Sequence, residues 1–165
     1  MLMDIHNAIV HLLLTASPHP RHEMKCLAQN SLSADFWTTR CTRCPDALDK
    51  LNGMAQDPKY ANVDFISICC DSCDGAREIL EKPDVPRWDA MHHYYMDPES
   101  KETAKKVLSF SMVPFYVFLN DKGEIVQKGN TNAVDFDQIP GVDAAAAPAA
   151  ASGGGEREFV MDEDF

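Results

Sequence analysis

The sequence predicts an α/β protein with a central mixed β-sheet and helices on both faces. Between residues 32 and 110, strand-like and helix-like segments alternate along the chain, which favours parallel strands joined by right-handed crossovers. After residue 112, two strand-like segments are separated by Asn-Asp-Lys-Gly, which is typical of a β-hairpin. The hairpin adds an antiparallel edge, so the sheet is expected to be mixed.

Length and composition indicate one globular domain. The chain has 165 residues, of which 45% are hydrophobic and 25% are charged, enough to build an ordinary buried core. The formal net charge is −11, and such a field repels phosphate backbones and anionic lipid surfaces. We therefore expect neither nucleic acid nor a membrane as a partner.

The first strand and helix flank a cysteine pair. Residues 32–37 are expected to be extended, and Cys41 and Cys44 follow directly. Residues 44–57 then carry apolar side chains at helical spacing, namely Leu48, Leu51 and Met54. This order predicts a strand, a turn and a helix, with the two cysteines at the turn.

The later elements follow from the same patterns. Residues 62–70 are rich in β-branched and apolar side chains and predict a buried strand. Residues 74–82 predict a short helix that ends before a proline, and residues 91–96 predict a short strand. Residues 101–110 predict a third helix, and the hairpin occupies 113–130.

Composition divides the chain into four parts. Residues 1–30 are interpreted as a helical extension, because Ile5, Ala8, Ile9, Leu12 and Leu13 have helical spacing. Residues 31–141 form the predicted domain. Residues 142–155 are rich in alanine and glycine and are interpreted as a flexible linker.

The last ten residues, 156–165, combine acidic and apolar side chains. We interpret them as a docking tail, in which acidic residues steer toward a basic surface and apolar residues anchor. The anchors are Phe159, Val160, Met161 and Phe165. Two alternatives remain open, a solvated acidic end and a segment that folds back on the domain.

Six cysteines bear on the compartment. The apolar stretch near the N-terminus does not have the pattern of a secretion signal, because Asp4 stands where positive charge is expected and His11 interrupts the stretch. Without such a signal, cysteines favour catalytic or metal-binding roles in a reducing compartment. We therefore expect a cytoplasmic protein.

The spacing Cys-x-x-Cys at the start of a helix indicates redox chemistry. Backbone N–H groups and the helix dipole favour the thiolate of Cys41 there. Arg40 and Arg43 add positive potential, which lowers the pKa of such a thiol further. Cys44, one turn on, could then resolve a mixed disulfide.

The segment D-F-W-T-T-R-C-T-R-C, Asp35 to Cys44, resembles the active-site segment of the thioredoxin superfamily, in which an aspartate, Phe-Trp and three residues precede Cys-x-x-Cys. Val113-Pro114 is similar to the apolar residue and cis-proline of that superfamily. The segment from Cys70 to Val113 is similar in layout to the nucleoredoxin and tryparedoxin branch. The resemblance implies a thioredoxin fold.

The resemblance also implies roles. Cys41 would be the nucleophile, Cys44 the resolving thiol and Asp35 a buried carboxylate that assists proton transfer. Val113 and Pro114 would form the platform for a bound peptide, with Arg40 beside it. Arg40 and Thr42-Arg43 replace the usual tryptophan and Gly-Pro, so substrate preference does not carry over. The residues alone also allow Asp35 to be a turn residue and Pro114 to be a trans-proline on an edge strand.

A second Cys-x-x-Cys, Cys70 and Cys73, allows three interpretations. The thiols could be packed or spare, they could form an auxiliary redox pair, or they could complete a zinc site with Cys41 and Cys44. We favour packed thiols and expect no metal. The neighbouring histidines 92 and 93 point to opposite faces of a strand, so they do not suggest one metal site.

Two functions follow. The first is a cytosolic thiol–disulfide oxidoreductase that acts on protein disulfides and needs no cofactor. The alternative is a largely non-catalytic adaptor, docked by its tail in a microtubule or axonemal assembly of a cilium or flagellum. Three features favour it: the replaced tryptophan and Gly-Pro, the acidic charge, and a linker that ends in an acidic-aromatic peptide. The layout also resembles thioredoxin-like proteins associated with microtubules and axonemes.

Overall fold

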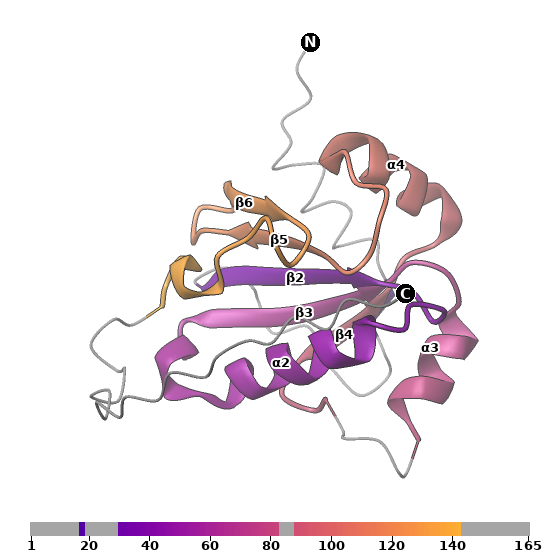
Figure 1. Ribbon diagram of the computed structural model, residues 1–165, viewed down its shortest axis with the longest axis horizontal. Helices are drawn as coiled ribbons and strands as arrows, with labels where there is room; N and C mark the ends of the chain where they lie inside the picture. Colours follow the sequence, from indigo (N-terminus) through magenta and orange to yellow (C-terminus); the bar gives the residue numbers. More distant parts are fainter. Residues whose placement is uncertain (1–16, 19–29, 83–87, 143–165) are drawn as a thin grey trace, which may run out of the picture.

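The computed structural model describes residues 17–18, 30–82 and 88–142, and within them a six-stranded sheet has the order β1-β4-β3-β2-β5-β6 (Figure 1). Strands β2, β3 and β4 are parallel, whereas β5, β6 and β1 run antiparallel to their neighbours. The predicted mixed sheet is confirmed. The strands are β1 Ser17–Pro18, β2 Ser31–Trp37, β3 Val63–Cys69, β4 His92–Tyr95, β5 Phe115–Leu119 and β6 Ile125–Gly129.

Helices cover both faces of this sheet, as the sequence predicts. Helix α2 (Cys44–Gln56) and helix α3 (Cys73–Leu80) contribute to one core, and helix α4 (Pro98–Leu108) contributes to the other. Two short 3-10 helices, η1 (Pro58–Tyr60) and η2 (Phe136–Gln138), complete the described elements. The sheet is thus a layer between two apolar cores.

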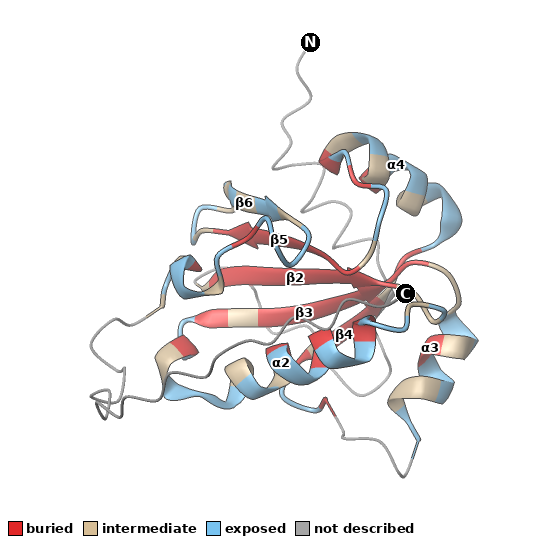
Figure 2. Ribbon diagram, in the orientation of Figure 1, coloured by how far each residue is buried: buried red, intermediate tan, exposed pale blue. Residues whose placement is uncertain are grey.

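Strand β2 lies at the centre, and every one of its residues is buried (Figure 2). Successive side chains of a strand point to opposite faces. Ala34 and Phe36 therefore pack in the core beside α4, whereas Trp37 packs in the core beside α2. By the same alternation Asp35 points to the face that Trp37 and α2 share.

Two helix starts differ from the predicted ones because polar caps extend them. The carboxylate of Asp97 accepts hydrogen bonds from the backbone N–H groups of Glu99 and Ser100, so α4 begins at Pro98 rather than at residue 101. Ser72 accepts from Gly75 N–H, so α3 begins at Cys73. The predicted strand at 91–96 is confirmed as β4.

The amino-terminal residues include one strand that the sequence does not suggest. Ser17 and Pro18 pair with Tyr95 and Tyr94 at the edge of the sheet. The helical spacing expected between residues 5 and 13 lies outside the described residues. The predicted linker, apart from Val142, and the whole predicted tail also lie outside them.

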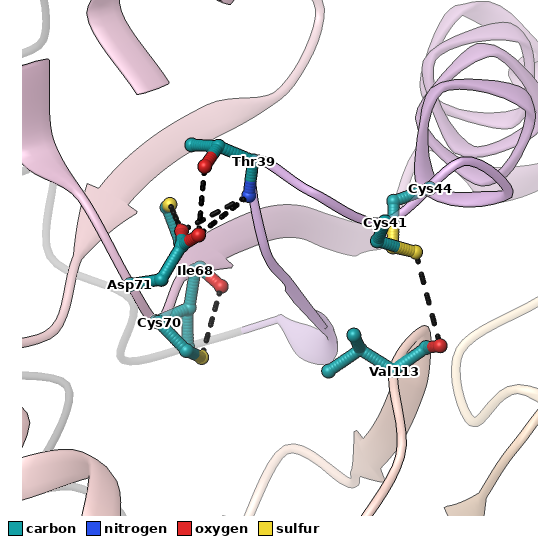
Figure 3. Close-up of a disulfide and its surroundings, with 8 residues drawn as sticks. Thr39, Cys41, Cys44, Ile68, Cys70, Asp71 and Val113 are labelled. Atoms are coloured by element: carbon teal, nitrogen blue, oxygen red, sulfur yellow. Dashed lines mark hydrogen bonds between the residues drawn. A yellow bond between two sulfur atoms is a disulfide. The ribbon is translucent and has the colours of Figure 1, made fainter. Parts of the chain in front are cut away.

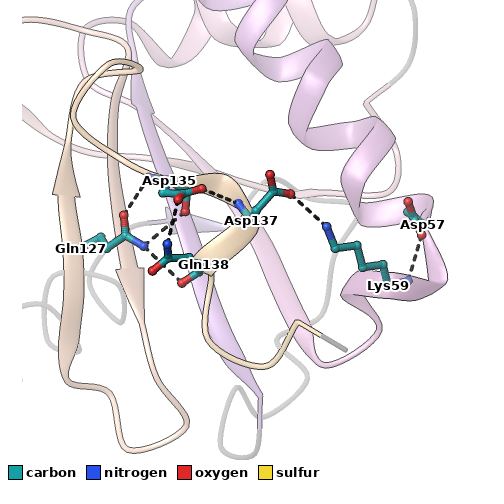
Figure 4. A network of polar contacts seen from close by, with 6 residues as sticks. All are labelled: Asp57, Lys59, Gln127, Asp135, Asp137 and Gln138. Carbon is teal, nitrogen blue, oxygen red and sulfur yellow. Dashed lines mark hydrogen bonds and ion pairs between the residues drawn. The ribbon is translucent and has the colours of Figure 1, made fainter. Parts of the chain in front are cut away.

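A polar network fastens the end of the domain to the amino ends of the parallel strands (Figure 4). Lys59 on η1 forms an ion pair with Asp137 on η2 at 2.9 Å. The Gln127 side chain on β6 accepts from Asp135 N–H at 2.8 Å and donates to the Gln138 carbonyl at 3.2 Å. Gly141, at φ 84°, closes against the backbone of Asn62. These contacts hold residues 135–142 at the end of the sheet where β3 begins.

Candidate functional site

Cys41 and Cys44 form a disulfide at the carboxyl end of β2, where the chain enters α2 (Figure 3). Their Cα atoms lie 5.4 Å apart, an ordinary separation for a disulfide. Cys44 is fully buried, whereas Cys41 is half-buried. An incoming thiolate can therefore reach Cys41 more readily than Cys44.

The start of α2 supplies positive potential to the pair. Arg43 occupies the N-cap position without a side-chain hydrogen bond, and Pro45 lies in the first turn. The first N–H groups of a helix have no intrahelical acceptor, and together with the helix dipole they favour a thiolate. Arg40 and Arg43 are both exposed on either side of Cys41. The arrangement fits a cysteine that reacts as a thiolate.

Val113 and Pro114 lie opposite the disulfide, although they follow it by some seventy residues in the chain. The peptide bond between them is cis, and the Val113 carbonyl oxygen lies 3.8 Å from Cys41 Sγ (Figure 3). The trans-proline alternative is therefore wrong. Met112, immediately before them, is 65% exposed. The backbone at Val113 thus borders the sulfur of Cys41, and an exposed apolar residue precedes it in the chain.

Asp35 lies within β2, so the alternative of a turn residue is wrong. Its carboxyl group is fully buried, and neither oxygen has a hydrogen-bond partner among the described residues. Burial raises the pKa of Asp35 to about 8, because a low-dielectric site disfavours the charged form. A carboxyl group with this pKa can accept and return a proton near neutral pH.

Asp71 ties the loop before Cys41 to the end of β3, a contact that sequence reasoning missed (Figure 3). Its carboxylate accepts from Thr39 N–H at 3.0 Å and from Thr39 Oγ1 at 2.7 Å. Cys69 Sγ and Ser72 N–H also donate to it. Burial alone would raise the pKa of Asp71, but these hydrogen bonds outweigh it and hold the pKa below its ordinary value.

The two loops enclose a shallow cleft of about 440 Å³ beside the disulfide. The contact between Asp71 and Thr39 could have been inferred from strand order. β2 and β3 are parallel neighbours, so the residues that follow them meet at one edge of the sheet. The lining residues are Thr38, Thr39, Arg40, Asp71 and Ser72.

The two cysteines of the second Cys-x-x-Cys, Cys70 and Cys73, do not form a disulfide. Cys70 is buried and Cys73 is exposed, and both thiols are free, as is the buried Cys69. Burial raises the pKa of Cys69 to about 11 and that of Cys70 to about 12. In the described part of the chain, no group of three His, Cys, Asp or Glu side chains is arranged to hold a metal ion.

The predicted docking residues cannot be placed. Phe159, Val160, Met161 and Phe165 lie outside the described residues, so the tail and the adaptor function built on it stay predictions.

Among the helices that the structure describes, none combines the length and apolar character needed to cross a bilayer.

Comparison with solved structures finds the same architecture at low sequence identity. The thioredoxin domain of a thiol–disulfide oxidoreductase from Bacteroides vulgatus aligns with a TM-score of 0.57 and 12% identity, over 68% of this chain and 80% of that one. The N-terminal domain of PilB from Neisseria gonorrhoeae aligns with a TM-score of 0.59 and 14% identity, over 74% and 82%.

A third structure, from Chlorobium tepidum and described as a thiol:disulfide interchange protein, aligns with a TM-score of 0.57 and 17% identity, over 70% of this chain and 79% of that one. In contrast, no family model and no curated protein matches the sequence. At these identities the likeness concerns the fold.

Proposed function

The chain has the thioredoxin fold, and we propose that it is a thiol–disulfide oxidoreductase that acts on protein disulfides through Cys41 and Cys44. One observation carries the proposal: a disulfide at a helix start whose more accessible sulfur lies 3.8 Å from the carbonyl oxygen that precedes a cis-proline, with a buried carboxyl group on the strand that leads to it. Two of the similar structures, a thiol–disulfide oxidoreductase and a protein described as a thiol:disulfide interchange protein, support the same chemistry.

In the first step the reduced protein attacks a client disulfide. The Cys41 thiolate bonds to one client sulfur, the client S–S bond breaks, and the other client sulfur leaves as a thiolate that takes a proton from solvent. The Val113 carbonyl lies beside Cys41 and the exposed Met112 precedes Val113 in the chain, so a client backbone can lie against this segment. The product is a mixed disulfide between Cys41 and the client.

In the second step Cys44 releases the client. Its buried thiol must lose a proton before it attacks Cys41 Sγ, and Asp35 lies on the same face of the sheet as the start of α2. The Asp35 carboxylate is the proposed acceptor of that proton. The Cys41–Cys44 bond forms, the client leaves as a thiolate, and two electrons have passed to it. A dithiol reductant returns the protein to its reduced form.

A reducing compartment such as the cytosol suits this cycle. Three further cysteines of the described chain are free thiols, of which two are buried. Buried, neutral thiols do not compete with Cys41 for a client disulfide, because the thiolate is the nucleophile. We therefore place the proposed reaction in a reducing environment.

The test is reduction of a disulfide-linked fluorogenic peptide by the full chain, recycled by a chemical dithiol. Wild-type protein should accelerate reduction over the dithiol alone, and Cys41→Ser should abolish the acceleration. Cys73→Ser serves as the matched control, since it removes an exposed thiol at the start of a neighbouring helix. Equal rates with and without wild-type protein would contradict the proposal.

A further inference from the structure

The cleft beside the disulfide contains one charged side chain without a partner. Arg40 lines this cleft and is exposed, and it takes part in none of the ion pairs, cation–π contacts or hydrogen bonds of the described residues. A guanidinium group carries five N–H donors in a planar fork, which matches a carboxylate through two parallel hydrogen bonds. Arg40 can therefore bind an anionic group that enters the cleft.

The other charged group of the cleft, Asp71, is already satisfied. Its carboxylate accepts hydrogen bonds from Thr39 N–H and Oγ1, from Cys69 Sγ and from Ser72 N–H. The described structure places no ion pair between this carboxylate and Arg40. The oxygens of Asp71 are thus occupied by the chain's own donors, and the charge of Arg40 stays available to a ligand.

The remaining side chains of the cleft favour the same kind of ligand. Thr38 and Ser72 carry hydroxyl groups, and each hydroxyl can donate one hydrogen bond. The polar side-chain groups that line the cleft and remain free are therefore a cation and hydroxyl donors. Such a set suits a carboxylate, which only accepts hydrogen bonds, better than it suits an ammonium group, which only donates them.

The cleft lies where a client chain would pass. Figure 3 shows Thr39 and Asp71 on one side of Cys41 and the Val113 carbonyl on another. A client attacked by Cys41 and lying against Val113 with one flank has its other flank near the cleft. Because an extended chain rises about 3.3 Å per residue, the first residues of that flank are within reach of Arg40, which immediately precedes Cys41.

The net charge of the whole chain does not cancel this attraction. The formal charge of −11 repels an acidic client at long range, but charges farther away than about 8 Å are largely screened at physiological ionic strength. Two exposed cations flank the reactive sulfur in the chain, Arg40 before Cys41 and Arg43 at the N-cap of α2. Short-range recognition is therefore governed by these arginines rather than by distant acidic residues.

We propose that Arg40 is a specificity-determining residue that selects client disulfides with an acidic side chain on one flank of the attacked cysteine. The client carboxylate accepts hydrogen bonds from the Arg40 guanidinium in the cleft, while the Cys41 thiolate bonds to the client sulfur and the client S–S bond breaks. This inference rests on the proposed function and adds a substrate class to it. Arg43 carries the same charge but does not line the cleft, so it makes no such contact.

The experiment compares matched peptide disulfides in the fluorogenic reduction assay. The two peptides of a pair differ only by glutamate or glutamine at one position, before or after the cysteine. Both peptides meet the same thiol, so the ratio of their rates cancels the thiolate fraction of Cys41. Dividing by the ratio found with the chemical dithiol alone removes the reactivity of the peptides themselves.

Wild type should reduce the glutamate peptide about two to five times faster than its glutamine partner, the range expected for an exposed ion pair. The preference should occur on one flank of the cysteine only, because the other flank lies along Val113. Arg40→Gln should remove it. Arg43→Gln is the matched control, since it removes the same charge near the same sulfur and should keep the preference.

A preference that survives in Arg40→Gln would overturn the proposal. An equal preference on both flanks would also overturn it, because a diffuse positive field, rather than a contact in the cleft, acts on both flanks alike. Equal losses in Arg40→Gln and Arg43→Gln would do the same. Both arginines are exposed and outside the described ion pairs, so neither substitution removes a contact that stabilises the fold.

A second measurement needs no disulfide exchange. The reduced chain is alkylated with bromoacetyl-glutamate amide or with bromoacetyl-glutamine amide, in which the carboxylate or carboxamide lies on the residue next to the reacting carbon. Peptide mapping by mass spectrometry then gives the rate at each thiol. Cys41 should favour the glutamate reagent in wild type and not in Arg40→Gln, whereas the exposed Cys73 should favour it in neither.

The two measurements separate this inference from the proposed function. A chain that reduces no peptide but shows the Arg40-dependent preference in alkylation of Cys41 would contradict the proposed function and leave Arg40 as the residue that recognises anions beside Cys41. A chain that reduces all the peptides without preference would overturn the selection of acidic clients and leave the proposed function standing.

Discussion

Two loops at one edge of the sheet contain the same Cys-x-x-Cys spacing and have different chemistry. After β2, the loop of residues 38–43 places Cys41 beyond the strand and Cys44 at the first position of α2. After β3, the shorter loop of residues 70–72 leaves Cys70 buried against the sheet and places Cys73 at the start of α3. The first pair is a disulfide and the second is two free thiols.

The difference lies in where each pair begins relative to the end of its strand. Cys70 follows the last residue of β3 directly, so its thiol stays in the core and donates to the Ile68 carbonyl. Cys41 has several residues of loop before it, and Asp71 holds that loop through Thr39. Spacing between two cysteines therefore does not by itself define a redox pair.

The largest expected difference between the two cysteine pairs is whether a mixed disulfide with a client accumulates. Cys44→Ser removes the resolving thiol, so the mixed disulfide on Cys41 should accumulate with a disulfide-containing peptide. Cys73→Ser should accumulate none, because Cys70 has no accessible sulfur for a client to reach. Intact-mass spectrometry after acid quenching measures the adduct. An adduct on Cys70 in either variant, or on Cys73 in Cys44→Ser, would erase the distinction.

The next difference concerns alkylation of the reduced protein. At pH 7.5, Cys41 should react with iodoacetamide at least about a hundredfold faster than Cys69 or Cys70, because their raised pKa values leave almost no thiolate. Peptide mapping by mass spectrometry gives each rate. If Cys41 reacts no faster than those buried thiols, the helix start and its flanking arginines do not activate it.

The buried carboxyl group of Asp35, on β2, makes the free energy of unfolding depend on pH. Folding raises the pKa of Asp35 to about 8 from an unfolded value of 3.8, so the folded state retains a proton that the unfolded state loses between those values. The contribution of Asp35 therefore becomes less favourable as pH rises from about 4 to about 8. Asp35→Asn should raise the melting temperature by several degrees at pH 7.5.

At pH 4 the same substitution should change the melting temperature much less, because Asp35 is then protonated in the folded state and still partly protonated in the unfolded state, so little of the penalty is present. Calorimetry of wild type and Asp35→Asn at the two pH values checks this. Equal melting temperatures at pH 7.5 would show that Asp35 has an ordinary proton affinity in the fold. Asp64→Asn, on the neighbouring strand and half-buried, is the control.

The smallest expected effect concerns the link between the two loops. Asp71→Asn leaves one oxygen to accept where the carboxylate offers two, so the loop before Cys41 should be held less firmly. We expect a change of about threefold in the alkylation rate of Cys41, comparable to the loss of one modest hydrogen bond. Asp74→Asn, an exposed residue paired with Arg77, should have no effect. Equal effects of the two substitutions would contradict the role of Asp71.

Local patterns predicted most of the fold and the centre of the site. The run of β-branched and apolar residues predicted β3, the short extended segment before the cysteine pair predicted β2, and the turn residues predicted the hairpin. The two-residue strand β1 has no periodicity to find, because its pairing with β4 depends on tertiary contacts. The early start of α4 follows from the Asp97 cap, which lies before the predicted helix at 101–110.

The sequence predicted those site residues that lie in the segment around the cysteine pair or that match the motif of the thioredoxin superfamily. Cys41, Cys44, Asp35 and Pro114 were named from the sequence, and the structure places the two cysteines, Pro114 and Asp35 around one edge of the sheet. Their roles stay predictions. Asp71 was missed, because its contact with Thr39 is set by strand register and no local pattern encodes register.

The contacts around Lys59 and Asp137 fix the position of residues 135–142 relative to the sheet. They therefore determine how the domain is oriented when the protein is attached to a surface through the chain after Val142. Residues 135–142 are fixed where β3 begins, and the disulfide lies at the opposite end of the parallel strands (Figure 1). A fluorophore, a fusion partner or a solid support joined after Val142 is thus attached at the pole away from Cys41. An array of domains immobilised in this way would present the Cys41–Cys44 pair outward.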